Sequence, residues 1–159
     1  MNPRPACRPG DDDLIVRPFR IGDYRAVLAL WRRTKGVGLN ESDTRDAIAS
    51  FLRRNPSFSF IAEKAGRIVG AVLCGHDGRR GYLHHLAVAA TQRRRGIGRR
   101  LVRTCLAELR QAGIRRCNIF VFANNERGMN FWRHSGWKLR ADLRLMQIRL
   151  EDASGTGKD

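Results

Sequence analysis

The stretch Gln92-Arg93-Arg94-Arg95-Gly96-Ile97-Gly98-Arg99 lies between an apolar strand pattern and an amphipathic helix pattern. Its glycines let the backbone turn tightly and approach a ligand without an intervening Cβ. The start of a helix offers unpartnered amide N–H groups and the positive end of the helix dipole, which together favour phosphate. The flanking arginines can pair with phosphate oxygens in a bidentate manner. The stretch therefore predicts a phosphate-binding turn between a strand and a helix.

Two better-known phosphate motifs do not fit this turn. The Walker motif is excluded because no Gly-Lys-Ser/Thr follows. A dinucleotide fingerprint is excluded because the third glycine is missing and the preceding strands form an antiparallel hairpin. The alternative interpretation is a glycine-containing loop whose arginines are solvated and bind nothing.

Apolar periodicity extends the prediction in both directions along the chain. It predicts an α/β (α+β) fold, a mixed and mostly antiparallel central sheet flanked by helices, in the order β-α-α-β-β-β-α-β-α-β. The expected strands are 14–16, 58–63, 67–75, 81–88, 118–122 (buried on both faces) and 139–150, with a bulge near Leu145-Met146; the expected helices are 24–31, 42–55, 97–111 and 126–134. Residues 13–150 are expected to form one domain, between a flexible arm at 1–12 and a flexible tail at 151–159.

Composition places the chain among globular proteins. Its 159 residues are 42% hydrophobic and 29% charged, which excludes a largely disordered or collagen-like chain. No apolar run is long enough to cross a bilayer, and no signal-peptide core follows Met1. We therefore expect a cytoplasmic protein without a membrane partner.

Charge is the outlying property, with 31 basic and 15 acidic side chains giving a net charge of +16. Eleven arginines and only one acid, Glu108, fall within 79–116, so the positive field is strongest there. Such a balance indicates an anionic partner, either a phosphorylated small molecule or a nucleic acid. The 27 arginines against 4 lysines also fit a bias in genome base composition with no functional meaning.

The cysteines and histidines do not form a metal site. Cys7, Cys74, Cys105 and Cys117 contain no C-x-x-C pair, and we expect them to be reduced. A two-residue turn at Asp77-Gly78 would leave His76 and His84 roughly 10–17 Å apart along paired strands. Zinc ligands at about 2.0–2.3 Å cannot be met from such positions. We expect no metal.

The chain resembles the GNAT superfamily of acetyl-CoA-dependent N-acetyltransferases. Arg93 to Gly98 matches the family's Arg/Gln-x-x-Gly-x-Gly/Ala motif at the start of a long helix, and residues 125–137 are similar to its Asn-x-x-Ala-x-x-Leu-Tyr-x-x-x-Gly-Phe segment. The order of elements agrees from residue 14 to 150. The sequence of residues 76–81 is also similar to that of a bacterial subgroup, the YpeA-like acetyltransferases.

This resemblance implies acetyl-CoA as co-substrate and an acetyl transfer by direct attack of an amine on the thioester. The residues that it implies for coenzyme A are Leu86, Ala87 and Val88 for the pantetheine arm, Arg93, Arg94, Arg95, Gly96, Ile97, Gly98 and Arg99 for the pyrophosphate, and Asn125 and Trp132 nearer the thioester. The acceptor is a primary amine, of a small molecule or a protein N-terminus. A net charge of +16 favours a neutral or anionic amine, or a peptide end, over a polycation.

The catalytic residues are less uniquely indicated. By the same resemblance, the backbone N–H of Val88 is the oxyanion donor, and Trp132 stands where the family has a tyrosine acid. An indole N–H donates a hydrogen bond but releases no proton at neutral pH, so water, the ammonium product or another phenol (Tyr82 or Tyr24) would have to replace it. The candidate bases are Tyr82, His84 and His85.

His84 and His85 are neighbours on one strand, so we expect them to point to opposite faces and only one to reach the acceptor. The alternative is that both are ordinary sheet residues. Glu41 and Asp43 are candidates to bind or deprotonate a cationic acceptor, and their alternative is a solvated helix start.

Two other functions stay open from sequence alone. One is a GNAT fold that binds coenzyme A without turnover, a possibility that stays open because Trp132 replaces the family's tyrosine acid. The other is a nucleic-acid-binding protein that uses the arginines, although no helix-turn-helix, zinc finger or aromatic RNA-binding motif is present. Oligomeric state is not determined, and a homodimer stays open.

Overall fold

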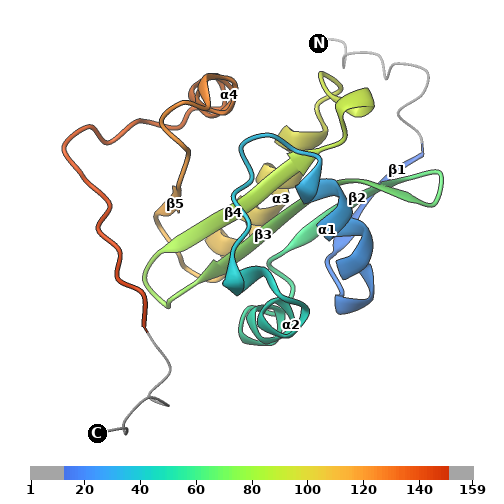
Figure 1. Cartoon of the computed structure of the whole chain (residues 1–159), viewed down its shortest axis with the longest axis horizontal. Helices are drawn as coiled ribbons and strands as arrows, with labels where there is room; N and C mark the ends of the chain where they lie inside the picture. Colours follow the sequence, from blue (N-terminus) through green and yellow to red (C-terminus); the bar gives the residue numbers. More distant parts are fainter. Residues whose placement is uncertain (1–12, 151–159) are drawn as a thin grey trace, which may run out of the picture.

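A five-stranded sheet forms the centre of the molecule, which a computed structural model describes for residues 13–150 (Figure 1). The strands lie in chain order, with the first four antiparallel and the last parallel to its neighbour. They are β1 (Leu14–Pro18), β2 (Phe60–Lys64), β3 (Arg67–His76), β4 (Gly81–Val88) and β5 (Cys117–Ile119). The mixed, mostly antiparallel sheet flanked by helices that the sequence predicts is confirmed.

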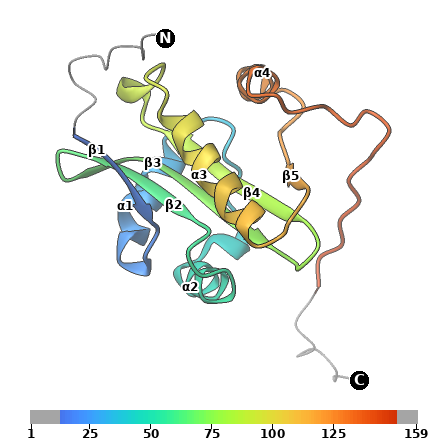
Figure 2. The ribbon, with the colours of Figure 1, turned by 180° about the vertical axis from the view of Figure 1, so that it is seen from behind.

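Helices cover the two faces of the sheet. On one face lie α1 (Tyr24–Arg32) and α2 (Arg45–Arg54), and on the other lies α3 (Ile97–Gln111), which crosses in front of the strands when the molecule is seen from behind (Figure 2). The fourth helix, α4 (Glu126–His134), packs on the α3 side through Phe131 and Trp132. Short 3₁₀ turns at Ile21–Asp23, Glu41–Asp43 and Ala90–Gln92 connect these elements.

Each face of the sheet has its own hydrophobic core, as the apolar periodicity of the helices requires. Leu101, Cys105 and Leu109 project from α3 into one core. Trp31 and Val27 of α1, both fully buried, fill the other together with Ile48 of α2. The 15 residues of α3 coincide with the predicted helix because its apolar stripe is long and uninterrupted.

Strands β4 and β5 pair only at their beginnings. The parallel register joins Gly81, Tyr82 and Leu83 to Cys117, Asn118 and Ile119 and then stops. From His84 to Val88, β4 has no strand partner on the β5 side within the described part of the chain. The sheet therefore opens along the second half of β4, and the open edge leads towards the start of α3.

The prediction of a last strand at residues 139–150 is wrong. Residues 139–150 form neither a strand nor a helix, and their large apolar side chains are exposed. The strand predicted at 118–122 is observed only as Cys117–Ile119, the residues that pair with β4. Phe120 and Phe122 are exposed, whereas the prediction has them buried on both faces of the sheet. Without a sixth strand at the outer edge among residues 13–150, nothing there holds residues 120–122 in the sheet.

The turn between β3 and β4 also differs from its prediction. His76 pairs with Gly81 and Cys74 with Leu83, so the connection has four residues, Asp77 to Arg80, rather than two. Asp77 caps this longer turn by accepting hydrogen bonds from the Arg79 and Arg80 amides.

Two findings bear on the surroundings of the domain. None of the helices within 13–150 has the length and apolar character needed to cross a bilayer. The predicted arm at 1–12 and tail at 151–159 lie outside the described residues.

Candidate active site

An extra residue in β4 shapes the middle of the open edge. The register pairs Ala71 with Ala87 but Leu73 with His84, so both His85 and Leu86 lie opposite Val72. This is a β-bulge, and His85 takes the left-handed conformation with φ +53°. A non-glycine residue in that conformation is held by its surroundings and often marks a functional position.

The bulge brings both histidines to the same face of the sheet. His84 packs edge-on against Phe51 of α2, and His85 packs against Trp31 of α1, with ring centroids 6.2 and 5.0 Å apart. Leu86, the next residue, returns to the α3 core. The expectation that the two histidines point to opposite faces is therefore wrong, because the bulge interrupts the alternation.

His85 is held by contacts from two elements, α1 and the 3₁₀ turn Glu41–Asp43. Its Nε2 donates to Oδ1 of Asp43 at 2.7 Å, and its carbonyl oxygen accepts from the indole Nε1 of Trp31 at 2.9 Å. Asp43 is 7% exposed, and its other carboxylate oxygen accepts from the Asn40 amide. The backbone carbonyl of Asp43 accepts from the Tyr24 hydroxyl at 2.8 Å. Asp43 is thus a buried, fully bonded partner of His85 and not a solvated helix start.

The carboxylate of Asp43 also determines which nitrogen of His85 is available. A carboxylate is an acceptor only, so Nε2 carries the proton and Nδ1 carries the lone pair. The imidazole keeps some contact with solvent, with 17% of its side chain exposed. A positioned imidazole with a free lone pair can accept a proton from a reacting amine.

His84 lies beside the His85–Asp43 pair in a partly buried position. Its ring stacks on Tyr82 with an interplanar angle of 11°. Burial lowers the pKa of His84 below its ordinary value, and nearby His85 lowers it further, whereas Asp43 opposes the shift. His84 is therefore neutral at pH 7, and within residues 13–150 its ring is held by these aromatic contacts rather than by a carboxylate.

The end of β4 presents its backbone to the open edge. The Val88 carbonyl accepts from Nε of Arg93 at 3.0 Å, while the next amide, that of Ala89, bonds back to Val69 in β3. Since the N–H and C=O of one extended residue point to the same side, the Val88 N–H also faces the open edge. This orientation suits a donor to an oxygen atom bound between β4 and β5.

The arginine-rich turn has the conformation that the sequence suggests. Arg94 and Gly96 both have positive φ, +63° and +79°, and Gly96 is the N-cap of α3. No side chain of the described residues caps the first turn of α3, so its amides are free to meet a ligand. Gln92, just before the turn, keeps a buried Oε1 without a hydrogen-bond partner among residues 13–150. These uncapped amides and flanking guanidinium groups fit a pyrophosphate.

The loop between α1 and α2 closes the site from the other side. A Cβ on Gly36 would collide with the Asn125 side chain, and one on Gly38 would come 2.6 Å from the Phe122 ring. Asn125 caps α4 by accepting from the Gly128 amide at 2.9 Å. The loop thus reaches from α1 across the open edge to the segment before α4, and both glycines are needed for that approach.

Trp132 and Tyr82 lie at different places around the opening. The Trp132 indole packs edge-on between Phe131 and Trp137, each at a centroid distance of 5.0 Å, and its N–H has no partner among the described residues. Tyr82 stacks between His84 and Phe120 on the face of α1 and α2. The structure therefore gathers His84, His85 and Tyr82 on one face, with Trp132 on the side of α3.

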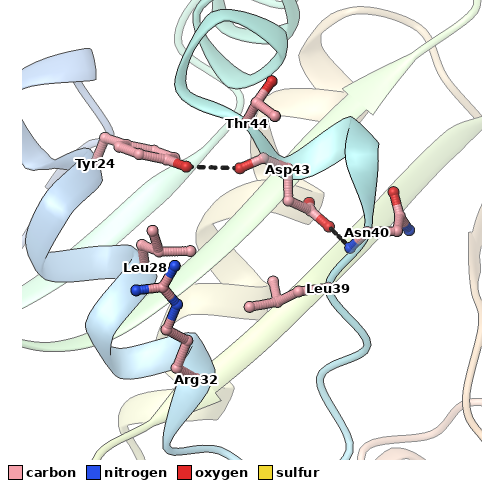
Figure 3. A pocket seen from close by; sticks show the side chains of 7 residues that line it. All are labelled: Tyr24, Leu28, Arg32, Leu39, Asn40, Asp43 and Thr44. Atoms are coloured by element: carbon pink, nitrogen blue, oxygen red, sulfur yellow. Dashed lines mark hydrogen bonds between the residues drawn. The ribbon is translucent and has the colours of Figure 1, made fainter.

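A small cavity adjoins Asp43 on the surface of the helical layer (Figure 3). Its volume is about 280 Å³, and the side chains lining it come from α1 and from the loop before α2. They are Tyr24, Leu28, Arg32, Leu39, Asn40, Asp43 and Thr44. Arg32 extends along this cavity without an ionic partner among residues 13–150, so the lining combines one unpaired guanidinium with the Asp43 carboxylate, which is bonded to His85 and Asn40.

Across residues 13–150, no cluster of three or more histidine, cysteine or acidic side chains is arranged to hold a metal ion. The groups that the described chain brings to this site are imidazole, carboxylate, backbone amides and guanidinium groups.

The buried state of His84 gives a pH-dependent contribution to stability. Its folded-state pKa lies below the unfolded value of about 6.5, so the unfolded chain binds more protons and stability falls as the pH drops through this region. We expect His84→Gln to lose less melting temperature between pH 7.5 and 5.5 than the unsubstituted protein. Thermal unfolding at both pH values measures this, with His134→Gln, on the exposed end of α4, as control. An equal loss in all three proteins would contradict the assignment.

Comparison with known proteins agrees with this geometry. The model of the acetyltransferase (GNAT) family matches residues 24–137. The chain is 28% identical over 135 residues to Acetyltransferase SG1711 of Sodalis glossinidius, covering 85% of this chain and 94% of that protein. It is 32% identical over 111 residues to Acetyltransferase ECA0875 of Pectobacterium atrosepticum, covering 70% and 78%.

A solved structure shares the fold at low identity. The PaiA N-acetyltransferase of Thermoplasma acidophilum, determined in complex with coenzyme A, superposes with a TM-score of 0.72 at 17% identity, over 80% of this chain and 91% of that one. The family model matches more than half of the chain, and the opening between β4 and β5 and the glycine turn before α3 agree with that match. This chain belongs to the GNAT family of acetyltransferases.

Proposed function

We propose that this protein transfers the acetyl group of acetyl-CoA to an amine, with His85 as the general base. The observation that carries the proposal is the His85–Asp43 hydrogen bond of 2.7 Å beside the open edge of β4. A bulge, a left-handed residue and a buried carboxylate together orient one imidazole, which a purely structural histidine does not require. His84, without a carboxylate to orient it among residues 13–150, is the alternative base.

The reaction forms one C–N bond and breaks one C–S bond. The neutral amine attacks the thioester carbonyl, Nδ1 of His85 takes the proton that the amine loses, and the tetrahedral intermediate expels the thiolate of coenzyme A. Asp43 stabilises the imidazolium that forms, since its carboxylate already accepts the opposite N–H. The Val88 N–H at the open edge is the proposed donor to the oxyanion.

The remaining part of acetyl-CoA follows the same edge. Its pantetheine arm would lie along Leu86, Ala87 and Val88, where β4 lacks a partner strand within the described chain. The pyrophosphate would be held by the uncapped start of α3, where the residues involved are Arg93, Arg94, Arg95, Gly96, Ile97, Gly98 and Arg99. Asn125 and Trp132 flank the opposite side of the opening.

The cavity beside Asp43 supports an acceptor that carries a negative or neutral group. Arg32 supplies a guanidinium without an ionic partner among residues 13–150, the Asp43 carboxylate in the same lining is already bonded to His85, and the chain as a whole is +16. A polycationic amine would be repelled by both. We infer a primary amine such as that of an amino acid or a peptide N-terminus as the substrate class.

Substitution at the pair tests the assignment of the base. We expect His85→Gln to lower kcat by about 100-fold or more, the range of a lost general base. Asp43→Asn keeps the shape of the carboxylate but not its charge, so it should lower kcat less than His85→Gln does. The assay is release of the coenzyme A thiol with a panel of neutral, anionic and polycationic amines, and the KM for acetyl-CoA should stay unchanged.

His84→Gln is the discriminating control for this experiment, because His84 lies on the same face of β4. Full loss in His84→Gln with activity retained in His85→Gln would assign the base to His84 instead. Binding of coenzyme A without acetylation of any amine in the panel would indicate a non-catalytic domain.

Two glycines of α3 provide a matched test of the pyrophosphate site. Gly96 and Gly113 stand at opposite ends of the helix, with φ of +79° and +77°, and a Cβ added to either would meet no other atom within 4 Å. Gly96→Asp places a carboxylate against the pyrophosphate and should weaken coenzyme A binding at least about tenfold. Gly113→Asp carries the same charge and backbone cost and should bind normally. Titration calorimetry measures both, and equal affinities would overturn the site.

Trp132 offers a test of how the thiolate is protonated. Replacing the indole with a phenol in Trp132→Tyr supplies a group that can release a proton, so we expect a higher kcat. Trp132→Phe is the control, because it has the same ring as tyrosine without the hydroxyl. Steady-state kinetics should rank the tyrosine variant above both other proteins; equal rates for tyrosine and phenylalanine would mean that no acid is needed at this position.

A further inference from the structure

The turn between β3 and β4 and the connection from α3 to β5 meet at one end of the molecule. The amide of Gly81, the first residue of β4, donates to the carbonyl of Arg116 at 2.8 Å. From here β4 and β5 run parallel, as neighbouring strands about 4.8 Å apart. In both views this end lies away from the start of α3 (Figures 1 and 2). Residues that are far apart in the sequence therefore share one small surface.

Four arginines gather at this end, and we call them the arginine surface. They are Arg79 and Arg80 of the turn and Arg115 and Arg116 of the connection. All four are exposed, and none has an ionic partner among residues 13–150. The acid in the turn, Asp77, is occupied by the Arg79 and Arg80 amides, which donate to its Oδ1. Glu108, one turn before the end of α3, forms no ion pair in the described chain. The positive charge is therefore not neutralised from within the domain.

Helix ends do not account for the arginine surface. A cation in the last turn of a helix is stabilised by the helix dipole, which explains Arg53 and Arg54 of α2 and Arg110 of α3. The four arginines of the surface belong to no helix. Within the described part of the chain, their guanidinium groups form neither an ion pair nor a hydrogen bond. They are therefore available to a partner outside the domain.

The turn between β3 and β4 is held rigid by side chains. Nδ1 of His76 accepts from the Gly78 amide at 3.1 Å, and the His76 ring packs edge-on against Phe58, with ring centroids 4.9 Å apart. The His76 amide donates to Oδ1 of Asn55, a buried residue at the end of α2. Together with the Asp77 cap, these contacts present the arginines of the turn from a fixed backbone. A fixed backbone lowers the conformational entropy that is lost on binding.

The arginine surface is distinct from the pyrophosphate site. It lies where β4 begins, whereas the glycine turn before α3 follows the end of β4. At about 3.3 Å per residue, the eight residues of β4 separate the two by roughly 23 Å. This is more than twice the distance, about 8–10 Å, over which salt screens exposed charges. A pyrophosphate bound at the start of α3 therefore does not neutralise the arginine surface.

The chemistry of the surface favours phosphate groups. A guanidinium pairs with phosphate oxygens through two parallel hydrogen bonds. No large apolar side chain is exposed at 53–58, 77–80 or 110–116. A protein partner would need aromatic or aliphatic anchors there, a lipid surface would need side chains that enter it, and an unpaired strand would need a ring on which its bases stack. The closely spaced phosphates of a nucleic-acid duplex need only cations.

We propose that the arginine surface binds the phosphate backbone of a nucleic-acid duplex without reading its sequence. Because the turn and the α3–β5 connection lie side by side, arginines from both segments contact phosphates of the same duplex. Phosphate contacts position a protein on a duplex but carry no sequence information. This inference does not depend on the proposed acetyl transfer.

Binding to labelled duplexes tests the proposal. The probes are an RNA duplex and a DNA duplex of the same sequence, each of about 20 base pairs, followed by fluorescence anisotropy. The unsubstituted protein should bind with a Kd of the order of 10⁻⁵ M and weaken steeply between about 0.05 and 0.2 M salt, because each phosphate contact releases counterions. Arg79→Gln/Arg116→Gln removes one arginine from each segment. Its affinity at the lower salt should fall at least about tenfold, and its slope of log K against log salt should become shallower by about two.

Arg25→Gln/Arg33→Gln is the matched control. These arginines lie near the two ends of α1, are exposed and have no ionic partner within 13–150. The control removes the same charge and should keep the affinity within about twofold. Saturating coenzyme A should leave duplex binding unchanged, because its proposed pyrophosphate site lies at the other end of β4. Far-UV circular dichroism confirms that each variant is folded.

The outcomes separate the alternatives. Loss of binding in the Arg79/Arg116 variant alone supports the proposal, and any preference between the RNA and the DNA probe identifies the duplex. Absence of binding, or equal weakening in both double variants, would overturn it, the second result indicating diffuse charge. Displacement by coenzyme A would place the duplex at the turn before α3 instead. Tighter binding to polyglutamate or to phosphatidylserine vesicles than to either duplex would also overturn the proposal, in favour of an acidic protein or a lipid surface.

Discussion

The one-residue bulge at His85–Leu86 is the constraint on which the candidate site depends, because it changes what each half of β4 faces. Before the bulge, β4 pairs with β5 and its side chains alternate regularly. After it, the strand has no described partner on the β5 side, and the Val88 amide faces that opening. The bulge also turns His85 towards Asp43, so one irregularity aligns the proposed base, oxyanion donor and pantetheine path along a single edge.

Two cores stabilise this irregular strand from opposite sides. Trp31, fully buried in the core under α1, donates to the His85 carbonyl, while Leu86 and Val88 pack into the core under α3. The left-handed backbone of His85 costs of order 1–3 kcal/mol, which a rigid surrounding structure must offset. The site is therefore built on the packed layers of the fold, and loops add Asp43, the glycine turn before α3 and the approach of Gly36 and Gly38 to Asn125 and Phe122.

Sequence reasoning predicted the elements whose signals are local and long. Helix α3 and strand β4 have the predicted bounds, and the glycine turn before α3 has the backbone that its residues suggest. The bulge was not predicted, although the three-residue step from Leu83 to Leu86 interrupts the apolar alternation and was its available signal. The Asp43–His85 bond joins residues 42 positions apart, and only the packing of the loop before α2 onto the sheet brings them together.

The failure of the last predicted strand has a different cause from the failure at the bulge. The alternation in residues 139–145 and its phase change at Met146 are genuine strand signals, yet a strand forms only where an edge is available to receive it. Residues 139–150 follow α4 after Trp137, whose ring packs on Trp132, and they pair with no strand among residues 13–150. The apolar pattern therefore describes a strand that finds no partner among the described residues, where Met146, for example, is 92% exposed.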